Sequence, residues 1–360
     1  MEPADTEDVT ERYARFAERE TSTHSAVLQA WAAGVAQDAE VAELIETLPS
    51  RERQPNLIFA ATRLADPDLV DPHQRVARDR EYELFRASLL GHWEQIRTIT
   101  AERHTQTNEA GRLAVVLPVL HQVATETGRE LALIELGASA GLALHPHWWR
   151  FRYVRRDQVP IAEFGPAGRE AITVVVKNHF DHPDPAEVPP VVVPPELPPI
   201  MWRLGVDQHP LNPAHPEDAE WLRTLVWPGQ SHRLTRLDAA IDAACHDPVL
   251  VLRHDITDPE AIDEVLRLVP RDYLPVVFHG AVLAYLSTAA RAAFAADMLR
   301  RVKAGELRWV CNEGQYVIPQ VVEALDSRPD FRRRLRRGAF VVSLDGRPLY
   351  QADGHAGWVL

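Results

Sequence analysis

A glycine-rich turn with the sequence IELGASAGL, at residues 134–142, is the sharpest candidate for chemistry in the chain. It overlaps an apolar run at 131–136 that has the composition of a buried strand. Gly137 and Gly141 allow a tight turn in which backbone amides approach a ligand closely, and Glu135 offers a carboxylate to a polar or cationic ligand end. This pattern favours a nucleotide-like ligand at the turn.

The same residues match the G-x-S-x-G pattern of a hydrolase nucleophile elbow, in which Ser139 is the nucleophile. Such an elbow normally follows several strands and an oxyanion loop, whereas the chain before Leu131 has the periodicity of helices. The other triad members would be Asp255 and His279, or Asp326 and His355. A serine hydrolase therefore stays open as an alternative, and so does a tight turn that binds nothing.

Short apolar runs that alternate with amphipathic segments indicate how the fold positions this turn. The runs lie at 131–136, 203–207, 249–255, 275–280 and 307–312, and they are typical of buried parallel strands. The alternation predicts an open α/β sheet in which right-handed crossovers place helices on both faces. Ligands of such sheets bind at the carboxyl ends of the strands.

The end of the chain departs from this alternation. Residues 339–344 and 348–353, joined by Asp345-Gly346, have the pattern of a β-hairpin. We expect this hairpin to form an antiparallel edge of the sheet.

A second departure is the segment 148–200. Residues 148–154 and 172–178 have strand patterns, and eight prolines crowd into 182–199. Because such a dense run of prolines cannot supply a sheet ladder, we expect an inserted hairpin followed by an extended, proline-rich strap.

The first third of the chain has helical periodicity. Apolar residues recur three and four positions apart, as in Leu28, Trp31 and Val35, and the last such stripe ends at Thr127-Gly128, a helix stop signal. We expect a helical domain over residues 1–127, on the lid or substrate side, and an α/β domain over residues 128–360.

Composition excludes several classes of function. With 39 Lys and Arg against 52 Asp and Glu, the net charge of -13 repels nucleic acids and anionic membrane surfaces. Cys245 and Cys311 are too few for a disulfide framework, the acidic start lacks the pattern of a signal peptide, and no apolar run is long enough to span a membrane. We expect a cytoplasmic protein whose partner is a small-molecule substrate, with neither nucleic acid nor membrane as a partner.

Six separated blocks of the sequence resemble the bacterial domain-of-unknown-function family 2332. They are TQTNEAGR at 105–112, IELGASAGL at 134–142, RLGVDQHPL at 203–211, EWLRTLVWPGQSHRLTRLDAAI at 220–241, VFHGAVLAYL at 277–286 and WVCNEG at 309–314. The resemblance covers nearly the whole chain. It implies a Rossmann-like, methyltransferase-type open sheet, mostly parallel with an antiparallel C-terminal hairpin, preceded by a helical domain.

The resemblance also implies a cofactor, S-adenosylmethionine, and roles for the acidic residues. Glu135 would face the aminoacyl end of the cofactor, Asp207 would pair with the ribose hydroxyls and Asp255 would accept from the adenine amino group. Gly137, Ser139 and Gly141 would form the turn beside it, with Ser139 where the usual methyltransferase loop has a third glycine. These residues predict a single cofactor site.

Acceptor binding is implied for a second set of residues. His279 would take a proton from the attacking nucleophile, and Tyr285 would line the same pocket, although a buried histidine that is hydrogen-bonded to the backbone is an alternative. The residues expected to bind the acceptor are Gln106, Asn108, Glu109, Arg112, Asn312 and Glu313. We expect a methyltransferase that acts on a small molecule; a non-catalytic protein that binds a nucleotide or metabolite is a further alternative.

Two other patterns give no site. His145 and His147 lack a third ligand at a characteristic spacing, so we expect no metal. The arginines between residues 328 and 337 are interpreted as a solvated helix face.

Overall fold

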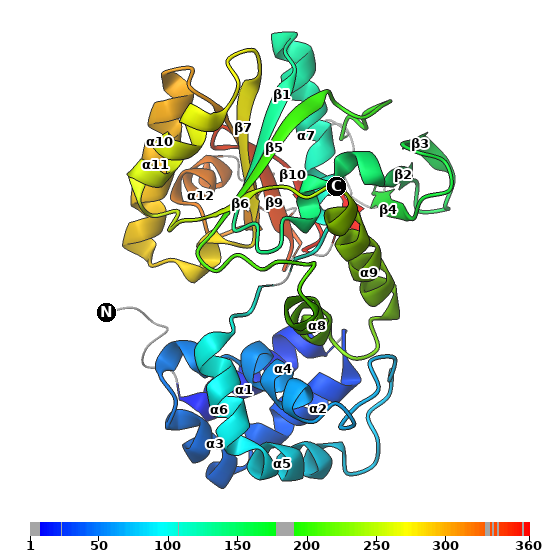
Figure 1. The fold of residues 1–360 in the computed structure, drawn as a ribbon, viewed down its shortest axis with the longest axis vertical. Coiled ribbons are helices and arrows are strands. Elements are labelled where there is room, and N and C mark those ends of the chain that lie inside the picture. The colour runs from blue at the N-terminus through cyan, green and yellow to red at the C-terminus, as the bar shows by residue number, and fades with distance from the viewer. Residues whose placement is uncertain are drawn as a thin grey trace. The chain divides into compact units, whose positions relative to one another are not determined.

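The computed structural model describes residues 8–22, 24–106, 108–177, 191–327, 332, 335–336, 338–354 and 356–360. In this part of the chain the protein is a mixed α/β protein with twelve α-helices and one eleven-stranded sheet (Figure 1). It divides into two compact units, Met1–Thr107 with Asn212–Asp238 and Asn108–Leu211 with Ala239–Leu360. The boundary expected between residues 127 and 128 falls within the second unit. None of the helices in the described ranges is both long and apolar enough to cross a bilayer.

The first unit is helical, which confirms the helices predicted from the periodicity of the first third of the chain. Its helices are α1 (Val9–Phe16), α2 (Ala26–Val35), α3 (Ala39–Glu46), α4 (Pro55–Ala65), α5 (Glu81–Gly91), α6 (Trp93–Glu102), α8 (Pro216–Leu225) and the start of α9 (Ser231–His246). Ser25 caps α2 by accepting a hydrogen bond from the backbone of Leu28. The ring of Trp31 lies 4.7 Å from that of Phe85 and 5.6 Å from that of Phe59, measured between centroids, so apolar stripes from different helices meet in one core.

The second unit contains the whole sheet. Its strands are β1 (Leu131–Leu136), β2 (Arg150–Val154), β3 (Pro160–Phe164), β4 (Ala171–Val176), β5 (Ile200–Asp207), β6 (Val251–Arg253), β7 (Leu274–Gly280), β8 (Arg308–Gly314), β9 (Phe340–Leu344), β10 (Arg347–Ala352) and β11 (Trp358–Val359). They lie in the order β3-β2-β4-β11-β10-β9-β8-β7-β1-β5-β6. The block from β6 to β8 is entirely parallel and contains all five predicted parallel strands.

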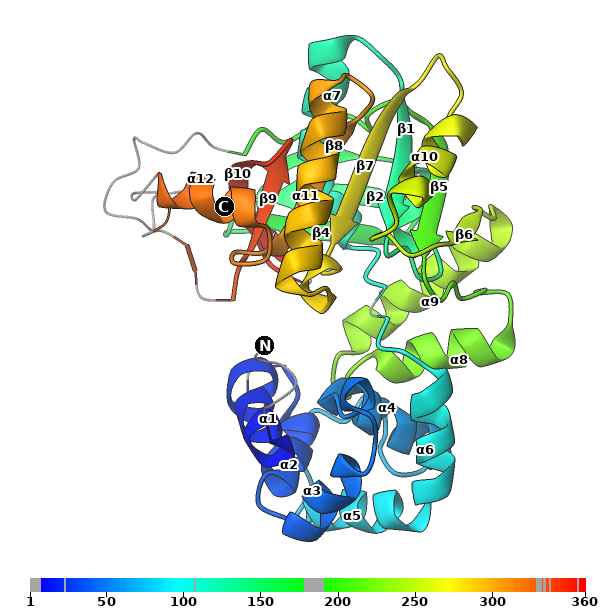
Figure 2. The same ribbon diagram turned by 90° about the vertical axis from the view of Figure 1, so that its left-hand side faces the viewer.

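Helices cover the parallel block on both faces. Figure 2 shows α10 (Pro259–Leu268) and α11 (Thr288–Lys303) in front of the central strands, with α7 (Arg112–Thr127) behind them. Ile134, Val277 and Trp309 form a core with these front helices, and α12 (Pro319–Asp326) adds to it. Because side chains alternate along a strand, Glu135 points to the opposite face from Ile134.

The predicted C-terminal hairpin forms, but it is not an edge of the sheet. Asp345 and Gly346 both have positive φ, 52° and 77°, as a tight hairpin turn requires. β9 pairs with β8, and β10 pairs with β11, which joins β4. The expectation of an antiparallel edge is wrong, because β11 continues the sheet from β10 to β4. β11 has only two residues, which is too short for a strand pattern to be recognised in the sequence.

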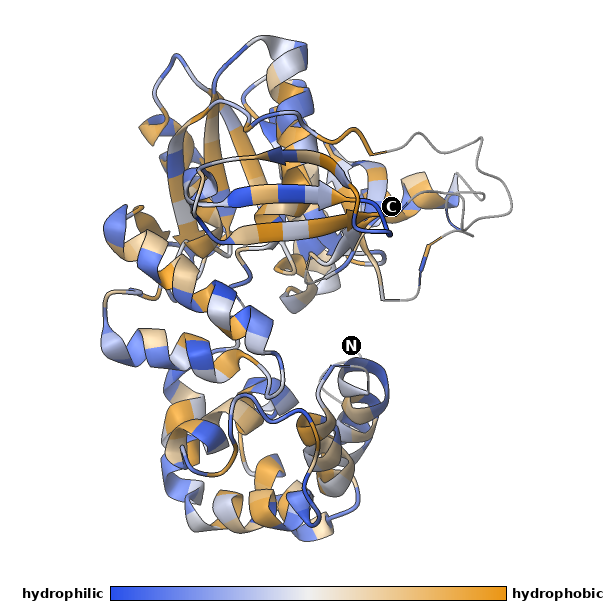
Figure 3. Cartoon of the chain, turned by 90° about the vertical axis from the view of Figure 1, so that its right-hand side faces the viewer, coloured by the Kyte–Doolittle hydropathy of each residue, from blue (hydrophilic) through white to orange (hydrophobic). Residues whose placement is uncertain are grey.

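The inserted segment forms a hairpin with a different partner from the one expected. β2 pairs antiparallel with β3, a strand that the sequence patterns do not predict, whereas β4 runs parallel to β2. Arg150 and Arg152 alternate with Phe151 and Tyr153 along β2, and the same alternation of colours marks the strands nearest the viewer in Figure 3. Of the predicted proline-rich strap, residues 182–190 lie outside the described residues, and 191–199 have no regular secondary structure.

Pro118 explains how α7 is attached to this part of the sheet. A proline has no N–H, so the carbonyl of Ala114, four residues earlier, has no helical donor. The hydroxyl of Tyr153 in β2 donates to this carbonyl at 2.6 Å. The helix therefore keeps a proline in its interior because a strand side chain satisfies the freed acceptor.

The burial of His145 predicts that the stability of the fold depends on pH. Its side chain is 2% exposed, and burial, helped by the charge of Arg203, lowers its pKa from 6.5 to about 4, against the opposite effect of Asp247. Between these values the unfolded chain binds a proton that the folded chain does not, so stability falls as the pH falls. At pH 5 we expect His145 to cost about 2 kcal/mol relative to pH 7.5. Urea unfolding at both pH values should show this loss in the wild type and a smaller one in His145→Gln; equal losses would contradict it.

Candidate functional site

The carboxyl ends of β1, β5, β7 and β8 lie at one edge of the sheet, because these strands are parallel neighbours. From β1 the chain reaches β5 on one side and later continues through β7 and β8 on the other. The direction of winding therefore reverses between β1 and β7, and a crevice forms at such a point in open α/β sheets. The glycine-rich turn follows β1 at this point.

Two side chains hold the turn in place. The carboxylate of Asp207, at the end of β5, accepts hydrogen bonds from the backbone N–H groups of Ser139 and His209, each at 2.8 Å. The side-chain amide of Asn108 donates to the carbonyl of Ala138 at 2.7 Å. Asp207 and Asn108, both predicted as site residues, therefore shape the turn itself.

The predicted glycines adopt the conformation that the pattern requires. Gly137 and Gly141 have φ values of 70° and 69°, and Ser139 between them has 51°, so Ser139 takes a backbone conformation that favours glycine. A Cβ atom at Gly137 would lie 2.4 Å from Cγ2 of Val282, and one at Gly141 would lie 3.2 Å from Cγ2 of Val251. The left-handed backbone at both positions, together with the close approach of Val282 at Gly137, accounts for the two glycines, and they do not by themselves indicate a ligand.

Glu135 has a buried carboxyl oxygen that its neighbours leave unsatisfied. Its Oε2 atom has no hydrogen-bond partner among the described residues, and the same is true of Oε2 of Glu313. Burial raises the pKa of Glu135 well above its usual range; the positive charge of Arg112 opposes this rise and the negative charge of Asp207 adds to it. A buried carboxyl oxygen without a donor is costly unless a ligand or water supplies one.

Arg112 lies at the start of α7, beside the end of β7. Its Nη1 donates to the carbonyl of Gly280 and its Nε to that of Gly354, both at 3.2 Å. Its charge acts on Glu135, as the pKa of that residue shows. Glu109, also predicted, is 6% exposed and accepts from the backbone N–H of Gly111 through Oε1 at 3.0 Å, so it holds the turn that precedes the same helix.

Asn312, near the end of β8, is a second buried group without partners. The residue is 1% exposed, and neither its Oδ1 nor its Nδ2 has a hydrogen-bond partner in the described part of the chain. Asn312 pairs with Gly280 in the sheet register, and Glu135 pairs with Phe278 two residues earlier, so both side chains are on one face. This face presents Glu135, Arg112 and Asn312 together, and we call them the polar cluster.

His279 and Glu313 lie on the other face and bond to each other. Nδ1 of His279 is 2.7 Å from Oε1 of Glu313, and Nε2 is 3.0 Å from Nε1 of Trp309. The indole only donates, so Nε2 of His279 is the acceptor and Nδ1 carries the proton. Both ring nitrogens are occupied, which favours the alternative of a buried core histidine over a proton acceptor.

The remaining predicted residues are more exposed or lie elsewhere. Asp255 accepts from Thr257 and from Gln208; burial alone would raise its pKa, but these hydrogen bonds lower it below its usual value. Tyr285 is 65% exposed, in the loop after β7. Gln106 belongs to the helical unit.

Of the two possible triads, Ser139 with Asp255 and His279 lies within the described residues and is not arranged for catalysis. Ser139 is 3% exposed, and its Oγ has no partner among the described residues. His279 bonds to Glu313, and Asp255 to Thr257 and Gln208. His355, of the other possible pair, lies outside the described residues. In the ranges that the structure covers, no group of three His, Cys, Asp or Glu side chains could hold a metal ion.

Two residues of the site escaped the sequence patterns. Val282 fills the space beside Gly137, and no pattern in the sequence around Val282 predicts this contact. Gly205 lies inside β5, and a Cβ there would be 2.7 Å from that of Ala138. An isolated glycine within a strand pattern is a known sign of close backbone approach, so Gly205 could have been found.

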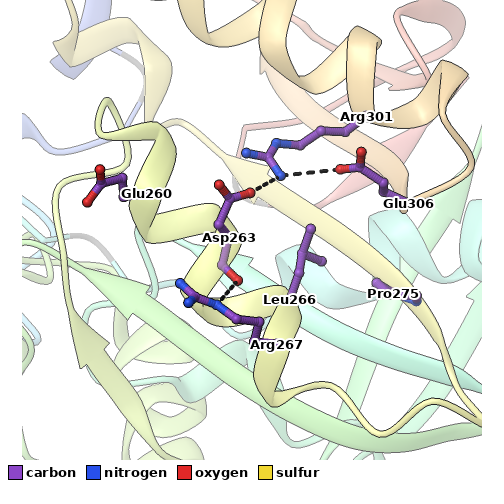
Figure 4. Close-up of a pocket in the computed structure, with 7 residues that line it drawn as sticks. All are labelled: Glu260, Asp263, Leu266, Arg267, Pro275, Arg301 and Glu306. Carbon is purple, nitrogen blue, oxygen red and sulfur yellow. Dashed lines mark hydrogen bonds and ion pairs between the residues drawn. The ribbon is translucent and has the colours of Figure 1, made fainter.

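An open hollow elsewhere in the sheet unit is distinct from this site. It is lined by Glu260, Asp263, Leu266, Arg267, Pro275, Arg301 and Glu306 (Figure 4). Pro275 is at the amino end of β7, whereas the polar cluster is at the carboxyl ends. Arg301 there is 2% exposed and bonded to Asp263 at 2.6 Å, so its charge is compensated.

Comparison with curated proteins finds no match to the chain. The sequence model of a family described as "Uncharacterized protein conserved in bacteria (DUF2332)" matches residues 10–359. Because this match covers almost the whole chain, the predicted family is confirmed, and the protein belongs to DUF2332.

Proposed function

We propose that the protein binds S-adenosylmethionine at the carboxyl edge of β1, β5 and β7 and transfers its methyl group to a small molecule. The observation that carries the proposal is the buried Oε2 of Glu135, which has no partner in the described part of the chain and lies directly before the glycine-rich turn. An acid at this position, close to a guanidinium, suits the ammonium and carboxylate of an amino-acid group. S-adenosylmethionine carries such a group next to a positively charged sulfur.

The strand order adds support. The block β6-β5-β1-β7-β8 has the order 3-2-1-4-5 of the Rossmann-type sheet, with the first strand in the middle. Asp207 and Asp255 follow the second and third strands of this block, and Gln208 links them by donating to Asp255 at 2.6 Å. The acids expected at the ribose and adenine positions are therefore neighbours at one edge.

The residues present fit the cofactor at its aminoacyl end. Glu135 would accept from the ammonium, and Arg112 would attract the carboxylate. A helix N-terminus does not follow the turn, because only the short 3-10 helix Leu142–Leu144 is there. S-adenosylmethionine has no phosphate that would need one. When bound, the cofactor supplies an electrophilic methyl group.

The chain's own contribution is alignment. Among the described residues, the side-chain amide of Asn312 has no hydrogen-bond partner, and it lies on the same face as Glu135, so it would orient the small molecule that accepts the methyl group. His279 is not available as a base in this arrangement, since both ring nitrogens are bonded. Methyl transfer depends mainly on bringing the acceptor into line with the sulfonium, so the proposal needs no designated base.

Isothermal titration calorimetry with S-adenosylmethionine tests the proposal. We expect the wild type to bind with a dissociation constant of about 1–100 μM, and Arg112→Met to weaken binding by about tenfold or more through loss of the guanidinium. Absence of heat at millimolar cofactor would reject the proposal. Binding without methylated product in a broad acceptor screen would instead favour the alternative of a non-catalytic metabolite-binding protein.

A further inference from the structure

Glu313 collects three hydrogen bonds on one oxygen atom. It is 1% exposed, and its Oε1 accepts from Nδ1 of His279 at 2.7 Å and from the backbone N–H groups of Val282 and Leu283 at 2.9 and 3.0 Å. These donors lie 30 to 34 residues earlier in the chain, on and after the neighbouring strand β7. The carboxylate thus ties the end of β8 to the loop that leaves β7.

Trp309 determines which tautomer of His279 is present in this group of hydrogen bonds. The indole N–H of Trp309 donates to Nε2 of His279 at 3.0 Å, so the proton of the neutral ring is on Nδ1 and is given to Glu313. All three side chains are at most 1% exposed. Oε2 of Glu313 has no partner among the described residues, so Oε1 alone makes the hydrogen bonds that hold this loop, and at this burial water does not compete for them.

The loop held by Glu313 forms a wall of the candidate site. Ala281 has a positive φ of 59°, which turns the chain back towards β1. The side chain of Val282 then occupies the space beside Gly137, in the turn that follows Glu135. Val282 therefore packs directly against the turn.

We propose that Glu313 is a positioning residue: by holding residues 281–285 against the glycine-rich turn, it sets the shape of the site that Glu135 and Asp207 form. It acts through Val282 and does not touch a ligand. Its effect on S-adenosylmethionine rests on the proposed function, whereas its effect on the loop does not.

Hydrogen exchange measured by mass spectrometry tests the hold on the loop. Glu313→Met keeps the volume of the side chain but removes the acceptor, and we expect amides 282 and 283 to exchange at least about tenfold faster. Glu313→Gln keeps one acceptor oxygen and should stay within about threefold of the wild type. Val265→Ala, a core truncation in α10, is the control for general destabilisation. Relative to the rest of the sheet unit, it should leave the exchange rate of amides 282 and 283 unchanged.

A loop that exchanges equally in the wild type and in Glu313→Met would overturn the proposal. If that variant does not fold, Glu313→Asp replaces it: its carboxylate is one methylene shorter and cannot reach all three donors, so faster exchange of amides 282 and 283 is again expected, and unchanged exchange rejects the proposal.

Calorimetry then separates the two proposals. We expect Glu313→Met to weaken S-adenosylmethionine binding by about tenfold or more, and Glu313→Gln to restore most of the affinity. If the wild type does not bind S-adenosylmethionine, the proposed function is rejected. The hydrogen-exchange result then decides alone whether Glu313 holds the loop. A wild type that binds, with an affinity unchanged in Glu313→Met despite a loosened loop, rejects the positioning role alone.

Discussion

Replacing Glu135 by Met is expected to abolish binding of S-adenosylmethionine and, at the same time, to make the protein more stable. The carboxyl group of Glu135 has a buried oxygen to which none of the described residues donates, and burial is the main reason that its pKa is raised well above the usual range. A methionine of similar length removes the unsatisfied group without leaving a large cavity. We expect a gain of about 1–3 kcal/mol in the free energy of unfolding, and a loss of affinity of about 100-fold or more.

Opposite signs in the two measurements make this prediction specific. A residue that served only to hold the fold would lose stability together with affinity, whereas a ligand-binding residue is kept at a cost in stability. Glu130→Gln is the matched control, since this glutamate is exposed and directly precedes β1. It should change neither quantity. A Glu135→Met protein that binds as well as the wild type would exclude Glu135 from the site.

The pH dependence of the stability gain gives an independent check. Because the pKa of Glu135 is raised above its ordinary value of 4.5, the folded chain holds this proton to a higher pH than the unfolded chain does. Stability from this group is therefore fully present below about 4.5 and is lost as the pH rises through the folded-state pKa. The advantage of Glu135→Met should be smallest at low pH and should grow towards neutral pH in chemical unfolding measurements.

The position of Glu135 could be predicted from the sequence because it depends on local order. An apolar strand followed by a glycine-rich turn places an acid at the end of a strand, whichever strands lie beside it. Asp207 could be located in the same way, at the end of β5. Its bond to the backbone of Ser139, across 68 residues, depends on the pairing of β1 with β5 and has no local signal.

His279 shows why neighbours in the sheet decide chemistry. From the sequence it is a histidine at the end of a strand, which suits a proton acceptor. In the fold, the register of β7 with β8 brings Trp309 and Glu313 to its two nitrogens. Which strand lies beside β7 is a tertiary property, and the same limit explains why the order of β10, β11 and β4 was not predictable.

Replacing Gly137 by Ala is expected to destabilise the protein much more than the same change at Gly128. Both glycines have left-handed backbones, with φ values of 70° and 64°. A Cβ at Gly128 would meet nothing within 4 Å, so Gly128→Ala measures the conformational cost alone, about 1 kcal/mol. A Cβ at Gly137 would lie 2.4 Å from Cγ2 of Val282, which adds about 1–3 kcal/mol of overpacking.

The second variant in the pair tests the cause of this difference. Val282→Ala removes the atom with which the new methyl group collides, so the double variant Gly137→Ala/Val282→Ala should recover about 1–2 kcal/mol relative to the sum of the single changes. Urea unfolding of the four proteins in the cycle measures this coupling. A coupling near zero, or equal losses at Gly137 and Gly128, would mean that Val282 does not define the space beside the turn. Since Val282 is the side chain through which the proposal links Glu313 to the turn, the same result would remove the physical basis of its positioning role.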